Sequence, residues 1–244
     1  MTSSKDRLAA LLPAAALPRE SQRFWWLAVI AAAAYGISLR QAPYPDQAVA
    51  KALMCALLLF AALYHRVGRE RPWLCAALIL SGAGDVLLAL PQLSSGFVAG
   101  LGAFLLAHLA YCAVFWPRRQ PWPALAIWRR AALILVWIAA AGAYALYWPR
   151  LGDLAVPVAC YVIVLAMMAS SALLARLAGD WAAVGALLFT VSDALIGASR
   201  FVGTVAGQAY AIWILYALAQ LLLCAGILAR RETRVMAQPW RDAT

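Results

Sequence analysis

Three ionisable residues lie within long apolar stretches of the sequence. Asp85 lies in LILSGAGDVLLAL, His108 in GLGAFLLAHLAYCAVF and Asp193 in GALLFTVSDALIGASRF. A charge inside a membrane is costly unless it faces the interior of a helix bundle, so such residues are functional candidates. We therefore treat these three side chains as candidates for proton transfer, either in catalysis or in transport.

Other polar residues accompany them. Lys51 lies near the start of one apolar stretch and Arg200 near the end of another. Ion pairs of Asp85 with Lys51 and of Asp193 with Arg200 would neutralise the charges and only fix the register of the helices, and this structural alternative stays open. Milder polarity comes from Tyr111, Tyr161, Ser192, Tyr216 and Gln220.

The chain offers little for a metal or a soluble cofactor. Its two histidines, His65 and His108, cannot form a three-histidine zinc site, and the five cysteines include no CxxC pair. We expect the cysteines to be small buried apolar residues. The sequence also lacks a P-loop, a GxGxxG after a strand and a GxSxG nucleophile motif. We therefore predict no cofactor, no metal and no serine-esterase chemistry.

The candidate residues belong to apolar segments that are long enough to cross a membrane. Hydrophobic residues make up 66% of the 244 residues and charged residues 12%, which excludes a soluble globular enzyme. The segments are continuous rather than alternating, which indicates helices instead of barrel strands. We predict an all-α polytopic membrane protein, a bundle of eight transmembrane helices, with a leader at 1–23, a catalytic domain at 24–230 and a tail at 231–244. The eight segments are 24–39, 48–64, 72–90, 96–116, 131–148, 154–174, 181–199 and 207–229.

The basic residues indicate how these helices cross the membrane. Most of the 20 Lys and Arg residues lie before the first segment, after every second one, and after the last. Cytoplasmic loops carry such an excess, so both termini should be cytoplasmic, as in a protein of the bacterial inner membrane. The same loops explain the net charge of +10 without nucleic acid. In this topology Asp85 and Asp193 both lie about 18–20 Å from the cytoplasmic face, where they could share a cavity with Lys51 and His108.

Four segments taken in order resemble the YhhN-like family of membrane lysoplasmalogenases. They are LSGAGDVLLAL, FVAGLGAFLLAHLAYCAVF, GALLFTVSDALIGASRF and YALAQLLL. The most specific parts are GDxLL, FxxGxxxFxxAHxxY and GAxxFxxSD. The similarity extends from the second predicted helix to the eighth, although the fifth and sixth add no sharp motif. Lys51-Ala52 stands where the family pattern leads us to expect Lys-Pro, a departure that leaves the lysine in place.

The resemblance implies an eight-helix enzyme that hydrolyses the vinyl ether bond of lysoplasmalogens. The products would be a fatty aldehyde and glycerophosphoethanolamine or glycerophosphocholine. On this analogy Asp85 and Asp193 are the catalytic carboxylates and His108 assists them. Substrate-binding candidates are Lys51, Tyr111, Tyr161, Ser192, Arg200 and Gln220. The partners would be the lysophospholipid substrate and the lipid bilayer.

The residue types suit this reaction. Protonation of the alkene carbon creates an oxocarbenium ion, which water captures as a hemiacetal. Two carboxylates can supply the acid, the compensating negative charge and the base, as in glycoside hydrolysis. Because burial disfavours a charged carboxylate, one aspartate can hold a proton while Lys51 or Arg200 keeps the other ionised. His108 could act as a proton relay.

Two other classes of function stay open at this stage. Buried Asp, Lys and His also build proton relays, so a proton-coupled transporter is the main alternative, although inverted repeats and broken helices are not evident. A family member could also hydrolyse a different ether lipid. A non-catalytic membrane scaffold is disfavoured, because two buried aspartates at matching depth would be costly without a function.

Overall fold

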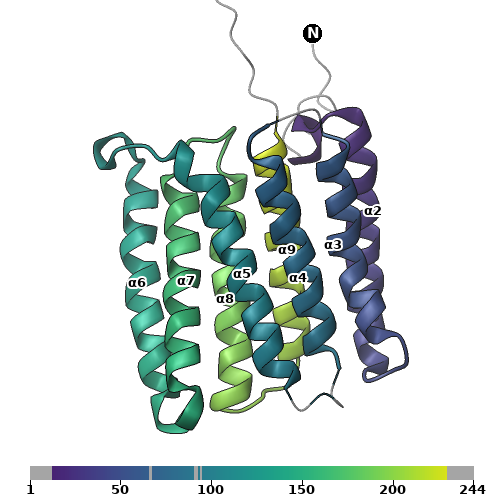
Figure 1. Cartoon of the computed structure of the whole chain (residues 1–244), viewed down its shortest axis with the longest axis vertical. Helices are drawn as coiled ribbons and strands as arrows, with labels where there is room; N and C mark the ends of the chain where they lie inside the picture. Colours follow the sequence, from purple (N-terminus) through teal and green to yellow (C-terminus); the bar gives the residue numbers. More distant parts are fainter. Residues whose placement is uncertain (1–12, 66–67, 91–92, 94, 230–244) are drawn as a thin grey trace, which may run out of the picture.

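A computed structural model describes residues 13–65, 68–90, 93 and 95–229 (Figure 1). The predicted tail and the first 12 residues of the predicted leader lie outside the described residues. The rest of the leader contains a short 3-10 helix, Pro13–Ala16, and the beginning of the first α-helix. This helix begins at Arg19, five residues earlier than predicted, directly after Pro18 in an extended conformation.

The described residues contain eight α-helices of at least 17 residues, which confirms the all-α fold. Six of them are long and apolar enough to cross a membrane, whereas α3 has only 17 residues. α2 carries Arg19, Glu20 and Arg23 in its first turns, which lowers its mean hydropathy. The helices are α2 (Arg19–Ser38), α3 (Gln47–Leu63), α4 (Arg71–Leu88), α5 (Gly96–Phe115), α6 (Ile127–Tyr147), α7 (Ala155–Leu174), α8 (Trp181–Phe201) and α9 (Gln208–Leu228).

The eight helices run roughly side by side, and consecutive helices point in opposite directions (Figure 1). α6 lies at one edge of the bundle and α2 at the other, with α5, α8, α4 and α9 between them. α2 is attached to α9 by two indole groups, since Trp25 Nε1 donates to the Leu221 carbonyl at 3.0 Å and Trp213 Nε1 to the Ala32 carbonyl at 2.9 Å. The start of α2 and the end of α9 therefore lie at the same end of the bundle.

That end also carries the connections after α3, α5 and α7, which contain most of the loop arginines (Figure 1). Arg129 is buried there and organises three segments. Its guanidinium donates to the carbonyls of Leu173 and Ala175, both at 2.9 Å, and to Asp180 Oδ1 at 2.5 Å. Because the last carbonyls of a helix have no partner within the helix, Arg129 closes the end of α7 while it anchors α6.

Small residues allow close contact where the site is built. A Cβ atom on Gly185 of α8 would lie 2.9 Å from the Ala219 carbonyl oxygen of α9, closer than real Cβ atoms come. A Cβ atom on Gly84 of α4 would lie 2.6 Å from the Phe104 ring of α5. The small residues before Asp85 therefore let Phe104 pack directly against the helix that carries this aspartate.

Candidate active site

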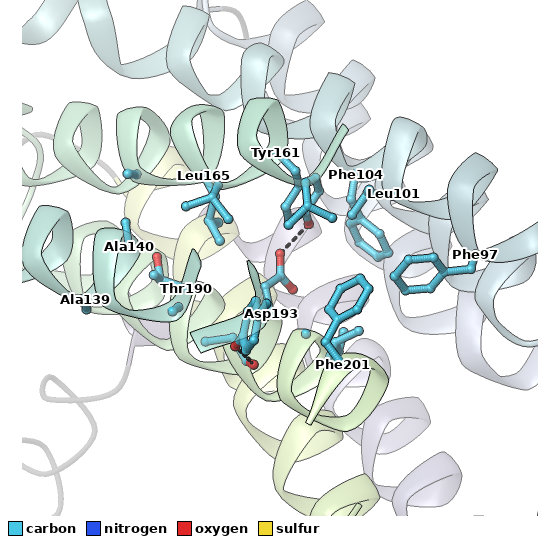
Figure 2. A pocket seen from close by; sticks show the side chains of 18 of the residues that line it. Phe97, Leu101, Phe104, Ala139, Ala140, Tyr161, Leu165, Thr190, Asp193 and Phe201 are labelled. Carbon is cyan, nitrogen blue, oxygen red and sulfur yellow. Dashed lines mark hydrogen bonds between the residues drawn. The ribbon is translucent and has the colours of Figure 1, made fainter. Parts of the chain in front are cut away.

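Asp193 lies on the inner face of α8, where it meets side chains from α5 and α7. Tyr161 of α7 donates its hydroxyl hydrogen to Asp193 Oδ2 at 2.5 Å (Figure 2). His108 Nε2 of α5 lies 3.8 Å from the same oxygen. Within the described part of the chain no hydrogen bond engages Asp193 Oδ1, so this oxygen is available to a ligand.

Asp193 and Tyr161 line an apolar cavity of about 100 Å³ between α4, α5, α6, α7 and α8 (Figure 2). Its walls consist mainly of aromatic and aliphatic side chains, with Thr190 as the other polar member near Asp193. Phe201 lines the cavity at the end of α8, eight residues beyond Asp193, which corresponds to about 12 Å of helix. The cavity thus has the polarity to receive part of a hydrocarbon chain beside one carboxyl group.

His108 is completely buried, and its ring packs against Tyr161 and Phe189 at centroid distances of 5.5 and 4.8 Å. Among the described residues neither ring nitrogen has a hydrogen-bond partner. Buried polar atoms are nearly always paired, so the unpaired imidazole of His108 is a candidate functional group. Its position beside Asp193 suits a proton carrier that serves this carboxyl group.

Asp85 lies on α4 in a second, more polar environment. Lys51 of α3 approaches Asp85 Oδ1 with its Nζ at 3.5 Å, while Tyr216 of α9 donates to Asp85 Oδ2 at 2.6 Å. The Cys55 thiol donates to Oδ2 at 3.6 Å and contacts the Tyr216 hydroxyl at 3.3 Å. A cation and two hydrogen-bond donors therefore surround this buried carboxyl group.

Gln220 and Tyr111 extend this environment away from Asp85. Gln220 Nε2 donates to the Tyr216 hydroxyl at 3.3 Å, and Tyr111 donates to Gln220 Oε1 at 2.6 Å. Both residues are fully buried and neither lines the apolar cavity. They hold Tyr216 against Asp85, so their link to the site is indirect.

The two carboxyl groups lie close enough to interact through their charges, but they do not line the same cavity. Phe104 lines the cavity, packs over Gly84 and contacts Tyr216 at a ring distance of 5.8 Å. Its ring therefore lies between the cavity and the residues around Asp85. Of the four residues expected to share one cavity, Asp193 lines the apolar cavity, whereas Asp85, Lys51 and His108 are not among its lining residues.

Two predicted residues lie outside these environments. The Ser192 hydroxyl donates to the Ile212 carbonyl at 3.0 Å and so connects α8 to α9. Arg200 is exposed, and its guanidinium lies 5.0 Å from the centre of the Phe97 ring at the end of the cavity near Phe201. The alternative of an Asp193–Arg200 pair is therefore not realised, whereas the Asp85–Lys51 pair is formed.

Tyr216 and Cys55 contact Asp85 but were not assigned to the site from the sequence. A possible signal was the helical spacing, since Cys55 follows Lys51 and Gln220 follows Tyr216 by four residues. The expectation that all cysteines are buried also fails, because Cys160 is exposed. Within the described ranges no cluster of three His, Cys, Asp or Glu residues could hold a metal ion.

The chain is similar over most of its length to a known family and to curated proteins. The YhhN family profile matches residues 46–227, which include every residue of the two environments. Two curated proteins named lysoplasmalogenase, from Mycobacterium bovis and Mycobacterium tuberculosis, are each 42% identical over 91% of this chain and 90% of their own. Lysoplasmalogenase TMEM86B from Homo sapiens is 34% identical over 60% of this chain and 59% of its own. No solved structure matches the chain significantly.

Proposed function

The chain belongs to the YhhN family, and we propose on that premise that it is a lysoplasmalogenase. It would hydrolyse the vinyl ether bond of a lysoplasmalogen to a fatty aldehyde and glycerophosphoethanolamine or glycerophosphocholine. The observation that carries the proposal is the position of Asp193, a carboxyl group in the wall of an apolar cavity with one oxygen held by Tyr161. The vinyl ether end of an alkenyl chain would enter this cavity, and its reacting carbon would meet the other oxygen.

The first step is proton transfer to carbon. Asp193 holds its proton on Oδ1, because an apolar cavity favours the neutral acid, while Oδ2 accepts the hydrogen bond from Tyr161. The proton is delivered to the second carbon of the alkenyl chain, whose π electrons form the new C–H bond. The first carbon and the ether oxygen then share the positive charge as an oxocarbenium ion.

Water completes the reaction without a cofactor. Asp193, now a carboxylate, removes a proton from the water that adds to the first carbon, as the acid of a glycosidase becomes the base. The resulting hemiacetal loses its hydroxyl proton, its bond to the glycerol oxygen breaks, and that oxygen receives a proton. Asp193, which took a proton from the water, gives it to the glycerol oxygen, and His108, at 3.8 Å from Asp193 Oδ2, exchanges protons with this carboxyl group.

Asp85 and Lys51 provide the electrostatic surroundings. The ionised Asp85 lies within Coulombic range of Asp193 and stabilises the positive charge that develops on the substrate. Lys51 keeps Asp85 ionised, while Tyr216 and Cys55 orient its carboxylate. Tyr111 and Gln220 support Tyr216, and Ser192 fixes α8 to α9 beside Asp193.

We further propose that all eight helices form one catalytic domain in a bacterial inner membrane, with both termini in the cytoplasm. The support is the common location of the start of α2, the end of α9 and the arginine-rich connections at one end of the bundle (Figure 1). Arg200 and Lys51 would then lie toward the outer face of the membrane.

Aldehyde release from a purified, detergent-solubilised protein tests the activity. The wild type should release fatty aldehyde from 1-alkenyl-glycerophosphoethanolamine, and Asp193→Asn should reduce kcat by at least about 100-fold. Asp153→Asn, an exposed carboxylate in the α6–α7 connection, should match the wild type. A folded wild type that releases no aldehyde would overturn the proposed function, and an Asp193→Asn protein of full activity would overturn the assigned acid.

A further inference from the structure

The apolar cavity beside Asp193 is too small to enclose a whole lysolipid. Its volume of about 100 Å³ lies well below the roughly 300–1,000 Å³ of sites that surround a complete small molecule. An alkenyl chain that presents its first carbons to Asp193 must therefore continue outside the cavity, along an apolar surface that adjoins it. The helix at the edge of the bundle next to this cavity is α6 (Figure 1).

Two attachments fasten α6 to α8. Near the start of both helices, Arg129 donates to Asp180 Oδ1 at 2.5 Å. Near their ends, the Tyr147 hydroxyl donates to the Ala194 carbonyl at 2.7 Å, and its ring packs on Gly197, where a Cβ atom would lie 2.8 Å from the ring. The attachments are separated by about 27 Å of α6. Within the described residues no other hydrogen bond or ion pair joins the two helices, so they are free to part between these points.

Small side chains line α6 between the two attachments. Ala139, Ala140 and Ala143 line the cavity, and Ala139 is also exposed on the surface of the bundle. Thr190 and Ala194 of α8 line the cavity too and are partly exposed. A cavity whose lining residues reach the surface is open there, so this cavity opens between α6 and α8. We call the opening bounded by these five residues the α6–α8 slot.

The seam between α6 and α7 is closed by side-chain hydrogen bonds. Trp137 Nε1 donates to Ser170 Oγ at 3.1 Å. The Tyr144 hydroxyl donates to the Ala155 carbonyl at 3.2 Å. Ala139 lies about 200° around the helix from Trp137, on a side of α6 that is turned away from α7. The exposure of Ala139 therefore marks an opening on the side of α8.

The slot lies at the depth of the membrane interior. Ala139 is about 18 Å of helix from the start of α6, and Thr190 about 14 Å from the start of α8. Ile138 of α6 and Val191 of α8 are exposed beside these two residues. In a bilayer with a hydrocarbon core of about 30 Å, lipid chains cover this surface. The slot therefore opens to lipid chains.

The other end of the cavity lies beside a positive charge. Figure 2 shows Ala139 on one side of Asp193 and Phe97 and Phe201 on the other. Arg200 is exposed at the latter end, with its guanidinium 5.0 Å from the centre of the Phe97 ring, and it forms no ion pair with a described residue. A free guanidinium binds phosphate through paired hydrogen bonds. Asp193 is also nearer to the end of α8 than to its start, which gives a polar head its shorter path to the membrane surface.

From these observations we infer that the α6–α8 slot is a lateral entrance through which the lysolipid passes from the bilayer to Asp193. The bound lipid keeps its orientation in the membrane. Its phosphate lies at Arg200, its vinyl ether beside Asp193, and the far part of its hydrocarbon chain leaves through the slot and stays among lipid chains. This inference rests on the proposed function and adds the path and orientation of the substrate.

Binding of a saturated ether, 1-O-hexadecyl-glycerophosphoethanolamine, tests the entrance independently of catalysis. Calorimetric titration into the purified protein gives its affinity. Ala139→Trp places an indole in the slot and should reduce the affinity at least about tenfold. Ala141→Trp, the same change at an exposed alanine outside the cavity, should leave it unchanged. Arg200→Gln should reduce it about fivefold, as expected for a partly exposed ion pair, and the exposed Arg150→Gln should not.

A photoreactive probe locates the hydrocarbon chain directly. It is the same ether lipid with a diazirine in the middle of its chain, irradiated on the wild type with and without an excess of the saturated ether. Cross-links that the excess suppresses should map to α6 and α8 around the slot. Suppressed cross-links confined to other helices, or none at all, would overturn the inference, as would wild-type affinity in Ala139→Trp or in Arg200→Gln.

Aldehyde release is measured on the same preparations, so that the entrance and the reaction are judged separately. Release by the wild type, together with full affinity in Ala139→Trp, refutes the entrance alone. Suppressed cross-links on α6 and α8 without aldehyde release from the wild type refute only the proposed reaction.

Discussion

The hydrogen bond from Tyr161 to Asp193 should contribute to catalysis by a calculable amount. Before proton transfer it joins a hydroxyl to a neutral acid, which is worth about 1 kcal/mol, and afterwards it joins the same hydroxyl to a carboxylate, worth about 1.5–3 kcal/mol. Only the difference, about 0.5–2 kcal/mol, lowers the barrier. Tyr161→Phe, which keeps the ring and removes the donor, should therefore reduce kcat by about 2- to 30-fold.

Tyr147→Phe provides the matched control. Tyr147 lines the same cavity, but its hydroxyl donates to the Ala194 backbone carbonyl at 2.7 Å, an acceptor whose charge does not change during the reaction. Initial rates of aldehyde release over a range of substrate concentrations should show a loss below about twofold for Tyr147→Phe, with KM almost unchanged in both variants. Equal losses in the two variants, or a Tyr161→Phe protein with the wild-type kcat, would refute the reasoning.

Three further predictions concern the cavity, the fold and metals. Ala140→Phe fills the cavity and should raise KM at least about tenfold. Ile134→Phe, on the exposed face of the same helix, should leave KM unchanged. Equal KM values for the two variants would show that the hydrocarbon chain of the substrate binds elsewhere. Arg129→Met leaves the carbonyls of Leu173 and Ala175 without their donor and should lower the free energy of unfolding by about 2–3 kcal/mol, as measured by thermal unfolding. An unchanged unfolding temperature would contradict a stabilising role of Arg129 at the end of α7. Treatment with EDTA should leave aldehyde release unchanged, because the described residues contain no metal-ligand cluster, and a loss restored by one added metal would contradict the carboxylate mechanism.

Much of the fold was predictable because apolar helices leave a continuous signal in the sequence. The eight predicted segments correspond to α2 through α9, with boundaries that differ by a few residues. The pairing of Asp85 with Lys51 was also within reach, since both residues lie in apolar segments at similar depth. A buried charge needs a partner, and few partners existed.

The sequence could not supply the lateral arrangement of the helices. Depth along a helix follows from residue counting, but the direction of a side chain around its axis depends on packing. Arg200 therefore looked like a partner of Asp193, although it lies outside over Phe97. Tyr216 and Cys55 carry no charge and resemble ordinary members of a helix core, so their contacts with Asp85 became visible only in three dimensions.

The central claim is that the vinyl ether is cleaved through proton transfer to carbon, and isotope incorporation tests it most directly. The reaction is run in D₂O, the released aldehyde is trapped at once, and the molecular mass of the trapped product is measured by mass spectrometry. We expect one deuterium on the carbon next to the aldehyde carbon in every product molecule, because the exchangeable proton of the catalytic acid comes from solvent. Aldehyde released without deuterium at that carbon would contradict the mechanism.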